Sequence, residues 1–313
     1  MARRETNLEE LLREKIEELV DEISIEELVP RIEERLVSEF GVVPQLHRII
    51  AVDGSVCMPE GVVHEAFDAV AHFVSNNIPV YLYGPTGSGK NHLCAQVADA
   101  LGLEFHYANS VTDEFKITGF VDAYGNYQET EFFRAFTQGG VFFLDEIDAS
   151  APEVLVCLNA AIENRYFAFP TGVRRAHKDF RVIAAGNTIG AGANSEYTGR
   201  TRLDEASLNR FALVPVDYDR QIDLLCAGGD HELVRFARQY RQAIRMCGVR
   251  SACSYRNLRM IKVAAATMPL DKAIMCCLAR GLNEDDRNHV AGTHCFDADN
   301  RFFKAFCDIE DSV

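Results

Sequence analysis

The sequence predicts an α/β protein in which a parallel sheet is followed by a region made only of helices. Five short apolar segments alternate with helix-like segments, which is typical of parallel strands joined by helices. These segments are Val80–Tyr83, Leu103–Ala108, Gly140–Leu144, Phe180–Asn187 and Ala212–Val216. From Asp217 onward the pattern is helical throughout. We therefore expect a five-stranded parallel sheet followed by a small helical lid.

Composition is that of an ordinary globular protein. Of 313 residues, 48% are hydrophobic and 25% are charged. No apolar run approaches the length that spans a bilayer, and the first ten residues lack the apolar stretch of a secretory signal. The ten cysteines form no Cys-x-x-Cys pair, so we expect reduced thiols. These features predict a cytoplasmic protein that does not enter membranes.

The formal net charge of −15 argues against a broad nucleic-acid surface, although it leaves room for a narrow basic channel. Residues 1–40 hold 13 acids and 6 bases, which is about half of that charge. Residues 8–23 place apolar side chains on one helical face. We expect a solvated helical hairpin here, and the alternative is a helix that docks a partner or a second copy.

The stretch Val80–Asn91, VYLYGPTGSGKN, predicts a phosphate-binding loop between a buried strand and a helix. Glycines let backbone N–H groups turn inward around an anion, and the helix N-terminus adds its positive dipole end. Lys90 then reaches the β- and γ-phosphates. The alternative is a glycine-rich turn that binds nothing. The candidate nucleotide-binding residues are Gly84, Pro85, Thr86, Gly87, Ser88, Gly89, Lys90, Asn91 and His92.

Asn91 departs from the usual pattern, in which Ser or Thr after the Lys binds Mg²⁺ through its hydroxyl. An amide oxygen also binds a hard cation, directly or through a water, but on a longer side chain. We therefore assign Asn91 to the metal site together with Asp145.

Asp145 and Glu146 follow the buried strand Gly140–Leu144, at the sheet edge where open α/β proteins bind ligands. In that position Asp145 orients Mg²⁺ and Glu146 polarises the attacking water. The alternative is an acidic loop that caps the helix opened by Pro152.

Two further candidate polar residues lie at the ends of predicted segments. Asn187 ends a strand at the same edge, where it can hold the lytic water or touch the γ-phosphate, although a terminal Asn is often only a turn residue. Arg210 ends the block Glu196–Phe211, just before the last strand. An Arg presented there suits a finger that completes a neighbour's site, and the alternative is a surface ion pair.

Two hairpins interrupt the alternating pattern. VDAYGNYQE turns at Gly125-Asn126, and a second hairpin turns at Pro170–Gly172 with Arg174 and Arg175 near its tip. Lys116 lies close to the first of them.

Five ordered motifs, GPTGSGKN, VFFLDEID, RVIAAGN, EYTGRTRLDEASLNRF and CSYRN, resemble the AAA+ ATPases of the MoxR-like, dynein-related group, which includes CobS- and CbbQ-type proteins. The resemblance covers about residues 50 to 265. It implies a P-loop NTPase fold, with Gly84, Gly87, Gly89 and Lys90 as Walker A and Asp145 and Glu146 as Walker B. It also implies Asn187 as sensor 1, Arg210 as arginine finger and Arg256 as sensor 2.

In relatives, hairpins like these face the pore or the partner. Asn91 is one departure from the family pattern, and Asn209, where relatives often have Asp, is another.

These inferences divide the chain into an acidic helical segment at 1–45, an AAA+ domain at 46–217 and a lid with tail at 218–313. We expect ATP and Mg²⁺ as ligands and catalysis by Glu146, Asn187, Arg210 and Arg256. A finger that completes a neighbour's site predicts a ring, and we expect a homo-hexamer that remodels a protein partner. Relatives often work with a von Willebrand factor A domain protein. The alternatives are a nucleic-acid motor or restriction-type nucleotidase, and a nucleotide-gated scaffold with little hydrolysis.

Overall fold

The computed structural model describes residues 49–50, 54, 56–57, 59, 61–193 and 197–309. The predicted helical segment at 1–45 lies outside them, as does Glu196. The described residues all belong to the unit His47–Val313. No helix in the described ranges has the length and apolar character needed to span a membrane.

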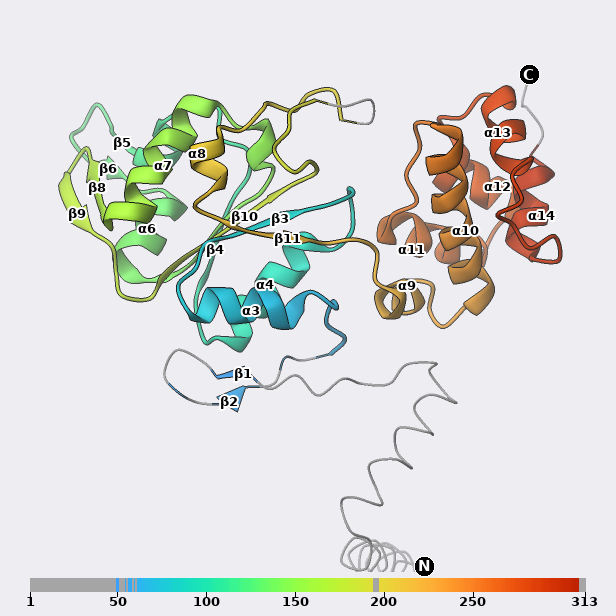
Figure 1. The fold of residues 1–313 in the computed structure, drawn as a ribbon, viewed down its shortest axis with the longest axis horizontal. Coiled ribbons are helices and arrows are strands. Elements are labelled where there is room, and N and C mark those ends of the chain that lie inside the picture. Colours follow the sequence, from blue (N-terminus) through green and yellow to red (C-terminus); the bar gives the residue numbers. More distant parts are fainter. Residues whose placement is uncertain are drawn as a thin grey trace, which may run out of the picture. The chain divides into compact units, whose positions relative to one another are not determined.

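A parallel five-stranded sheet forms the centre of the fold, as the sequence predicts (Figure 1). Its order is β11-β3-β10-β7-β4, and every neighbouring pair is parallel. The bounds are β3 Val80–Tyr83, β4 Phe105–Ala108, β7 Gly140–Leu144, β10 Phe180–Gly186 and β11 Ala212–Pro215.

The strand order places the phosphate-binding loop at a crevice. The chain leaves β3, returns along β4, β7 and β10, and then crosses to β11 on the other side of β3. Ligands bind at such a switch in strand order, beyond the carboxyl ends of the strands. Tyr83 at the end of β3 is in register with Gly186 at the end of β10. The loops after these two strands therefore begin side by side.

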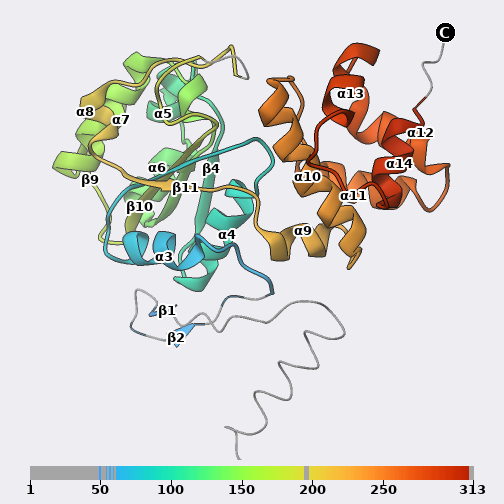
Figure 2. The same cartoon turned by 45° about the vertical axis from the view of Figure 1, so that its right-hand side comes forward.

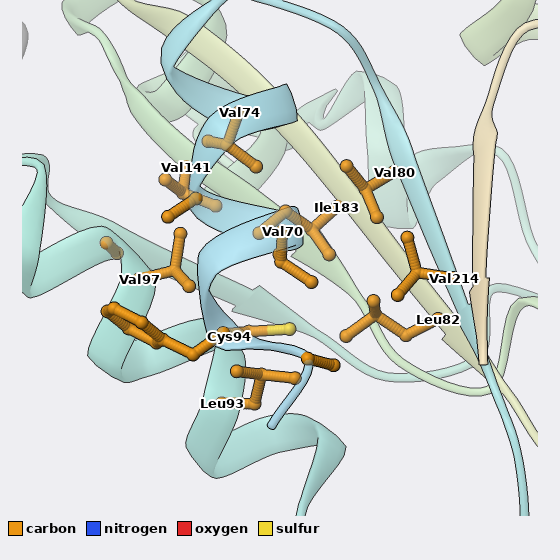
Figure 3. Close-up of a cluster of buried hydrophobic side chains, with 14 of the residues drawn as sticks. Val70, Val74, Val80, Leu82, Leu93, Cys94, Val97, Val141, Ile183 and Val214 are labelled. Carbon is orange, nitrogen blue, oxygen red and sulfur yellow. The ribbon is translucent and has the colours of Figure 1, made fainter. Parts of the chain in front are cut away.

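One face of the sheet is covered by α3 (Phe67–Ser75) and α4 (Lys90–Ala100). Figure 3 shows Val70 and Val74 of α3 packed with Val141 and Ile183 of the sheet, in one buried apolar cluster. Burial of this area is the main favourable contribution to folding. It also fixes α4, whose first turn carries Lys90.

The other face carries α6 (Glu131–Gln138) and α7 (Pro152–Asn164) over a second apolar cluster. Aromatic rings dominate it, and Phe132 makes edge-to-face contacts with Phe142, Phe167 and Phe180. Alternate residues of β7 face the two clusters, as the period of a strand requires. The sheet is thus buried on both sides, so its strands read as continuous apolar runs.

Both predicted hairpins are present. β5 (Phe120–Val121) pairs with β6 (Tyr127–Gln128), and β8 (Tyr166–Phe169) pairs with β9 (Gly172–Arg175). Tyr124, in the first turn, is 91% exposed. β1 (Ile49–Ile50) and β2 (Val56–Cys57) form a third, short antiparallel pair. The remaining short helices of the sheet region are α5 (Phe115–Thr118) and α8 (Glu205–Leu208).

After β11 the described chain is helical, as predicted (Figure 2). Its helices are α9 (Arg220–Cys226), α10 (His231–Cys247), α11 (Tyr255–Ala264), α12 (Leu270–Ile274), α13 (Glu284–Ala291) and α14 (Arg301–Cys307). A π-helical turn, Met275–Ala279, follows α12 directly. The last two helices, α13 and α14, lie in the C-terminal part of this region. Phe302 and Phe306 of α14 pack against Phe236.

Candidate nucleotide site

The loop between β3 and α4 has the backbone that a phosphate cradle needs. Gly84, Gly87 and Gly89 have φ values of 155°, 68° and 86°, a region that other residues adopt only with strain. The space is as restrictive as the angles. A Cβ on Gly84 would lie 2.1 Å from the carbonyl oxygen of Val216, and one on Gly87 would lie 2.6 Å from Cβ of Ser254. Glycine is therefore required at both positions.

Lys90 starts α4 and turns back over the loop. Its Nζ donates to the carbonyl oxygens of Gly84 and Pro85, at 2.8 and 2.9 Å, and to Oδ1 of Asn187 at 3.3 Å. Burial lowers the pKa of Lys90 to about 8, and the charge of Asp145 opposes that shift. An ammonium group held by neutral carbonyls lacks a full counter-charge, and a phosphate would supply one.

Ser88 supports the same assignment. Its Oγ is buried and has no hydrogen-bond partner among the described residues. A buried hydroxyl without a partner is uncommon and calls for an explanation. Together with the left-handed glycines and the buried Lys90, it indicates a loop shaped for an anion with several acceptor oxygens.

Asp145 and Asn91 face each other across the crevice. Nδ2 of Asn91 donates to Oδ2 of Asp145 at 2.7 Å, and the hydroxyl of Tyr107 lies 3.4 Å from the same oxygen. The backbone N–H of Glu146 donates to Oδ1. A carboxylate and an amide, side by side at the cradle, fit Mg²⁺, which prefers oxygen ligands. The two residues assigned to the metal are therefore brought together.

Glu146 follows Asp145 in a left-handed backbone conformation, with φ of 52° and ψ of 43°. A residue other than glycine is held there at a cost of about 1–3 kcal/mol, and such strain gathers at functional sites. Its side chain is 42% exposed, and Oε1 lies 3.3 Å from a guanidinium nitrogen of Arg200. Glu146 also lines the phosphate-loop hollow, a pocket whose lining includes residues 86–92 of the loop and the start of α4.

Asp148 is a buried residue at the carboxyl edge of the sheet, and it was not among the site residues predicted from the sequence. Its side chain is fully buried, and its Oδ2 accepts hydrogen bonds from the N–H groups of Asn187 and Thr188 and from Oγ1 of Thr188. Its Oδ1 pairs with Arg200 at 3.3 Å. Asp148 therefore joins the loop after β7 to the loop after β10.

Asn187 lies where the sequence placed it, at the end of β10 beside Lys90. Its backbone is fixed by Asp148, so the side chain starts from a defined position. It lines the phosphate-loop hollow and also a second hollow of about 430 Å³ beside the loop.

The helical region lines one side of the phosphate-loop hollow, which measures about 440 Å³. Arg256 and Arg259 line it from α11, together with Ile222 of α9. Arg256 is exposed and lies in the first turn of α11, after the capping residue Ser254. Spacing of three residues places the two arginines on one side of α11. Arg259 was not anticipated from the sequence.

Two tyrosines hold Thr86, in the middle of the phosphate loop. Its N–H donates to the hydroxyl of Tyr197 at 3.1 Å, and its carbonyl oxygen accepts from the hydroxyl of Tyr218 at 2.8 Å. The guanidinium of Arg241 lies 3.7 Å from the ring centre of Tyr218 and forms a buried bidentate pair with Asp223. The phosphate loop is thereby connected to α9 and α10.

Arg210 is not part of this hollow. It lies just before β11, whose Ala212 pairs with Val80 at the start of β3, whereas the phosphate loop follows the end of β3. The two ends of a four-residue strand are roughly 10 Å apart. Arg210 instead makes an ion pair with Glu163 of α7 at 3.2 Å. Arg210 therefore lies at the amino ends of β3 and β11, whereas Lys90 lies beyond the carboxyl end of β3.

Residues 79–211 match the family model described as AAA domain (dynein-related subfamily). The predicted resemblance is thereby confirmed for this segment. It runs from the residue before β3 to the residue after Arg210.

Several curated relatives are similar over most of the chain. An uncharacterized protein from Staphylococcus epidermidis is 29% identical over 248 residues, which cover 72% of this chain and 91% of the relative. The uncharacterized protein YojN from Bacillus subtilis is 29% identical over 201 residues, which cover 60% of this chain and 62% of YojN.

Among solved structures, NtrX from Brucella abortus matches with a TM-score of 0.41 and 16% identity, over 69% of this chain and 49% of NtrX. A putative ATPase from Cytophaga hutchinsonii matches with a TM-score of 0.39 and 18% identity, over 50% of this chain and 47% of that one.

Proposed function

We propose that this protein is a Mg²⁺-dependent ATPase that works as a ring. The observation that carries the proposal is the convergence of Lys90, Asp145, Glu146 and Asn187 on one hollow, which Arg256 lines from α11. They come from the loops after three parallel strands and from the helical region. The match to an AAA domain supports nucleotide hydrolysis as their shared purpose.

The residues suit in-line attack of water on the γ-phosphate. The oxygen of the water bonds to the γ-phosphorus while Glu146 accepts a proton from that water. The bond between the γ-phosphorus and the oxygen that bridges it to the β-phosphate breaks, and ADP and inorganic phosphate leave. Lys90 and Asn187 stabilise the phosphate oxygens, and Arg256 adds positive charge from α11. Mg²⁺, held by Asp145 and Asn91, would neutralise charge on the β- and γ-oxygens.

The position of Arg210 supports a ring. Because Arg210 lies at the end of the strands opposite to its own phosphate loop, where it pairs with Glu163, a catalytic role for it requires the site of a neighbouring copy. A contact in which one surface meets a different surface of the next copy closes into a ring or runs into a helix. We propose the ring, with six copies as in the family it resembles.

The coupling of hydrolysis to work would run through Thr86. Its two tyrosine contacts tie the phosphate loop to Tyr218, and through Arg241 to α10. Loss of the γ-phosphate changes the contacts of this loop and would shift the helical region against the sheet. We propose a protein as the client, and the exposed hairpin around Tyr124 is a surface that suits it.

The test measures phosphate release from ATP with and without Mg²⁺. It also measures the mass of the assembly with and without ATP. We expect turnover that requires Mg²⁺ and an oligomer that forms with ATP. Glu146→Gln should bind ATP and assemble, and should lose turnover by about 10²–10⁴-fold, the usual contribution of a general base. A parent protein that stays a single chain and releases no phosphate would contradict the proposal.

A further inference from the structure

Arg200 joins two carboxylates that the proposed mechanism treats separately. One guanidinium nitrogen lies 3.3 Å from Oε1 of Glu146, and the other lies 3.3 Å from Oδ1 of Asp148. Its side chain is 13% exposed, so the pairs are shielded from solvent more than a surface ion pair is. A planar guanidinium holds two acceptors in a fixed relation, which a lysine ammonium does not.

The position of Arg200 is fixed from the Asp148 side. Thr201 donates its N–H to the carbonyl oxygen of Asp148 at 2.7 Å, so the chain at Arg200 is bound to the turn after β7. The carboxylate of Asp148 is in turn fixed by three donors from Asn187 and Thr188. Space for it exists because position 186 is glycine, where a Cβ would lie 3.0 Å from the carboxyl carbon of Asp148.

Glu146 has fewer constraints of its own. Its side chain is partly exposed, and Arg200 is the one partner that the structure gives to its carboxylate within the described residues. A freely rotating glutamate would spend much of its time away from the reacting water, because a general base must lie within hydrogen-bond reach of the proton that it takes. Arg200 restricts that rotation.

We infer that Arg200 is a positioning residue, which sets the carboxylate of Glu146 in relation to Asn187 through Asp148. The inference rests on the proposed hydrolysis for its effect on rate, but not for the contacts themselves. Arg200 links the residue that activates water to the residue that touches the γ-phosphate. Its removal leaves nucleotide binding intact and disorders the base.

The first experiment compares Arg200→Ala with Arg202→Ala, an exposed arginine on the same segment whose backbone bridges to Ala191. We expect Arg200→Ala to lower kcat by about 10–100-fold, the usual effect of removing a supporting hydrogen-bond partner, with KM for ATP within about threefold. Arg202→Ala should match the parent. Arg200→Lys should recover only part of the loss, because an ammonium does not span both carboxylates.

Two outcomes would overturn the inference. An Arg200→Ala protein with the parent's kcat would show that Glu146 needs no such support. A faster one would show that the pair holds Glu146 away from the water.

The second experiment needs no turnover. Thermal unfolding of the nucleotide-free parent, Arg200→Ala, Glu146→Gln and the double variant forms a cycle that isolates the interaction between the two residues. We expect the shift of the double variant to be smaller than the sum of the single shifts. Additive shifts would overturn the inference. If the parent releases no phosphate, the proposed function fails, whereas this cycle still decides whether Arg200 fixes Glu146.

Discussion

The side-chain amide of Asn91 donates a hydrogen bond to Oδ2 of Asp145 across 2.7 Å. This contact engages an oxygen of the carboxylate that we assign to Mg²⁺. A Ser or Thr at position 91 would offer its hydroxyl to the metal instead. A cation that binds Oδ2 of Asp145 therefore competes with the Asn91 contact.

We expect Asn91→Thr to lower the Mg²⁺ concentration that gives half-maximal turnover. The hydroxyl can bind the cation directly, and the carboxylate of Asp145 is released from the amide. A titration of phosphate release against Mg²⁺ measures the change. Asn288→Thr, at an exposed position of α13, is the matched control and should behave as the parent. An unchanged or higher Mg²⁺ requirement in Asn91→Thr would show that the amide itself is a good ligand.

Lys90 should make the nucleotide-free protein less stable at neutral pH. Its pKa falls from 10.5 in the unfolded chain to about 8 in the folded protein, chiefly because of burial. Between these values the unfolded chain binds more protons, so the free energy of unfolding rises with pH. The full difference corresponds to about 3 kcal/mol as an upper bound, at 1.36 kcal/mol per pKa unit.

Denaturant unfolding of Lys90→Met without nucleotide checks this expectation. The variant should be more stable than the parent at pH 7, and its advantage should shrink as pH rises from 8 toward 10. It should also lose the stabilisation that ATP gives to the parent. Lys178→Met, at a side chain that is 83% exposed, should show neither effect. A constant difference between Lys90→Met and parent at all pH values would contradict the expected titration.

Arg210→Ala and Glu146→Gln should each lose turnover alone and recover it when mixed. In a mixed ring, a protomer with intact Glu146 can lie beside a protomer with intact Arg210, and random mixing makes about a quarter of the sites complete. Phosphate release after mixing and reassembly measures the recovery, with each variant alone at the same total concentration as control. Lack of recovery would mean that Arg210 does not act in a neighbour's site.

Tyr218→Phe should separate the hydroxyl contact from the ring contact. The change removes the donor to the carbonyl oxygen of Thr86 and keeps the ring against Arg241, so we expect a loss of about 1 kcal/mol in the free energy of unfolding. Tyr218→Ala also removes the cation–π contact and should cost about 3 kcal/mol. Denaturant unfolding compares the two. Equal losses would assign the whole effect to the hydroxyl.

The sheet and the phosphate loop could be predicted because their signals are local. Four or five apolar residues in succession mark a strand buried on both faces, and Gly84, Gly87 and Gly89 mark the turn of the loop. The two hairpin turns are local in the same way. Lys90 and Asn187 come together because parallel strands present their carboxyl ends at one edge.

The supporting residues could not be predicted in this way. Arg200 meets Glu146 across 54 residues of chain, and Tyr218 meets Thr86 across 132. No periodicity or turn pattern records such pairs, because they depend on how the loops after different strands meet. Asp148 lies only two residues beyond Glu146 in the sequence, but its burial, which requires partners for the carboxylate, is visible only in the structure.

Gly87 lies in the phosphate loop and, at the same time, beneath the capping residue of α11. A side chain at that position would push Ser254 away as well as crowd a phosphate. Damage at position 87 therefore mixes two defects, a poorer grip on the anion and a misplaced α11. Loss of function in a variant at position 87 would therefore not by itself show a lower affinity for ATP. The position of α11 would have to be measured separately.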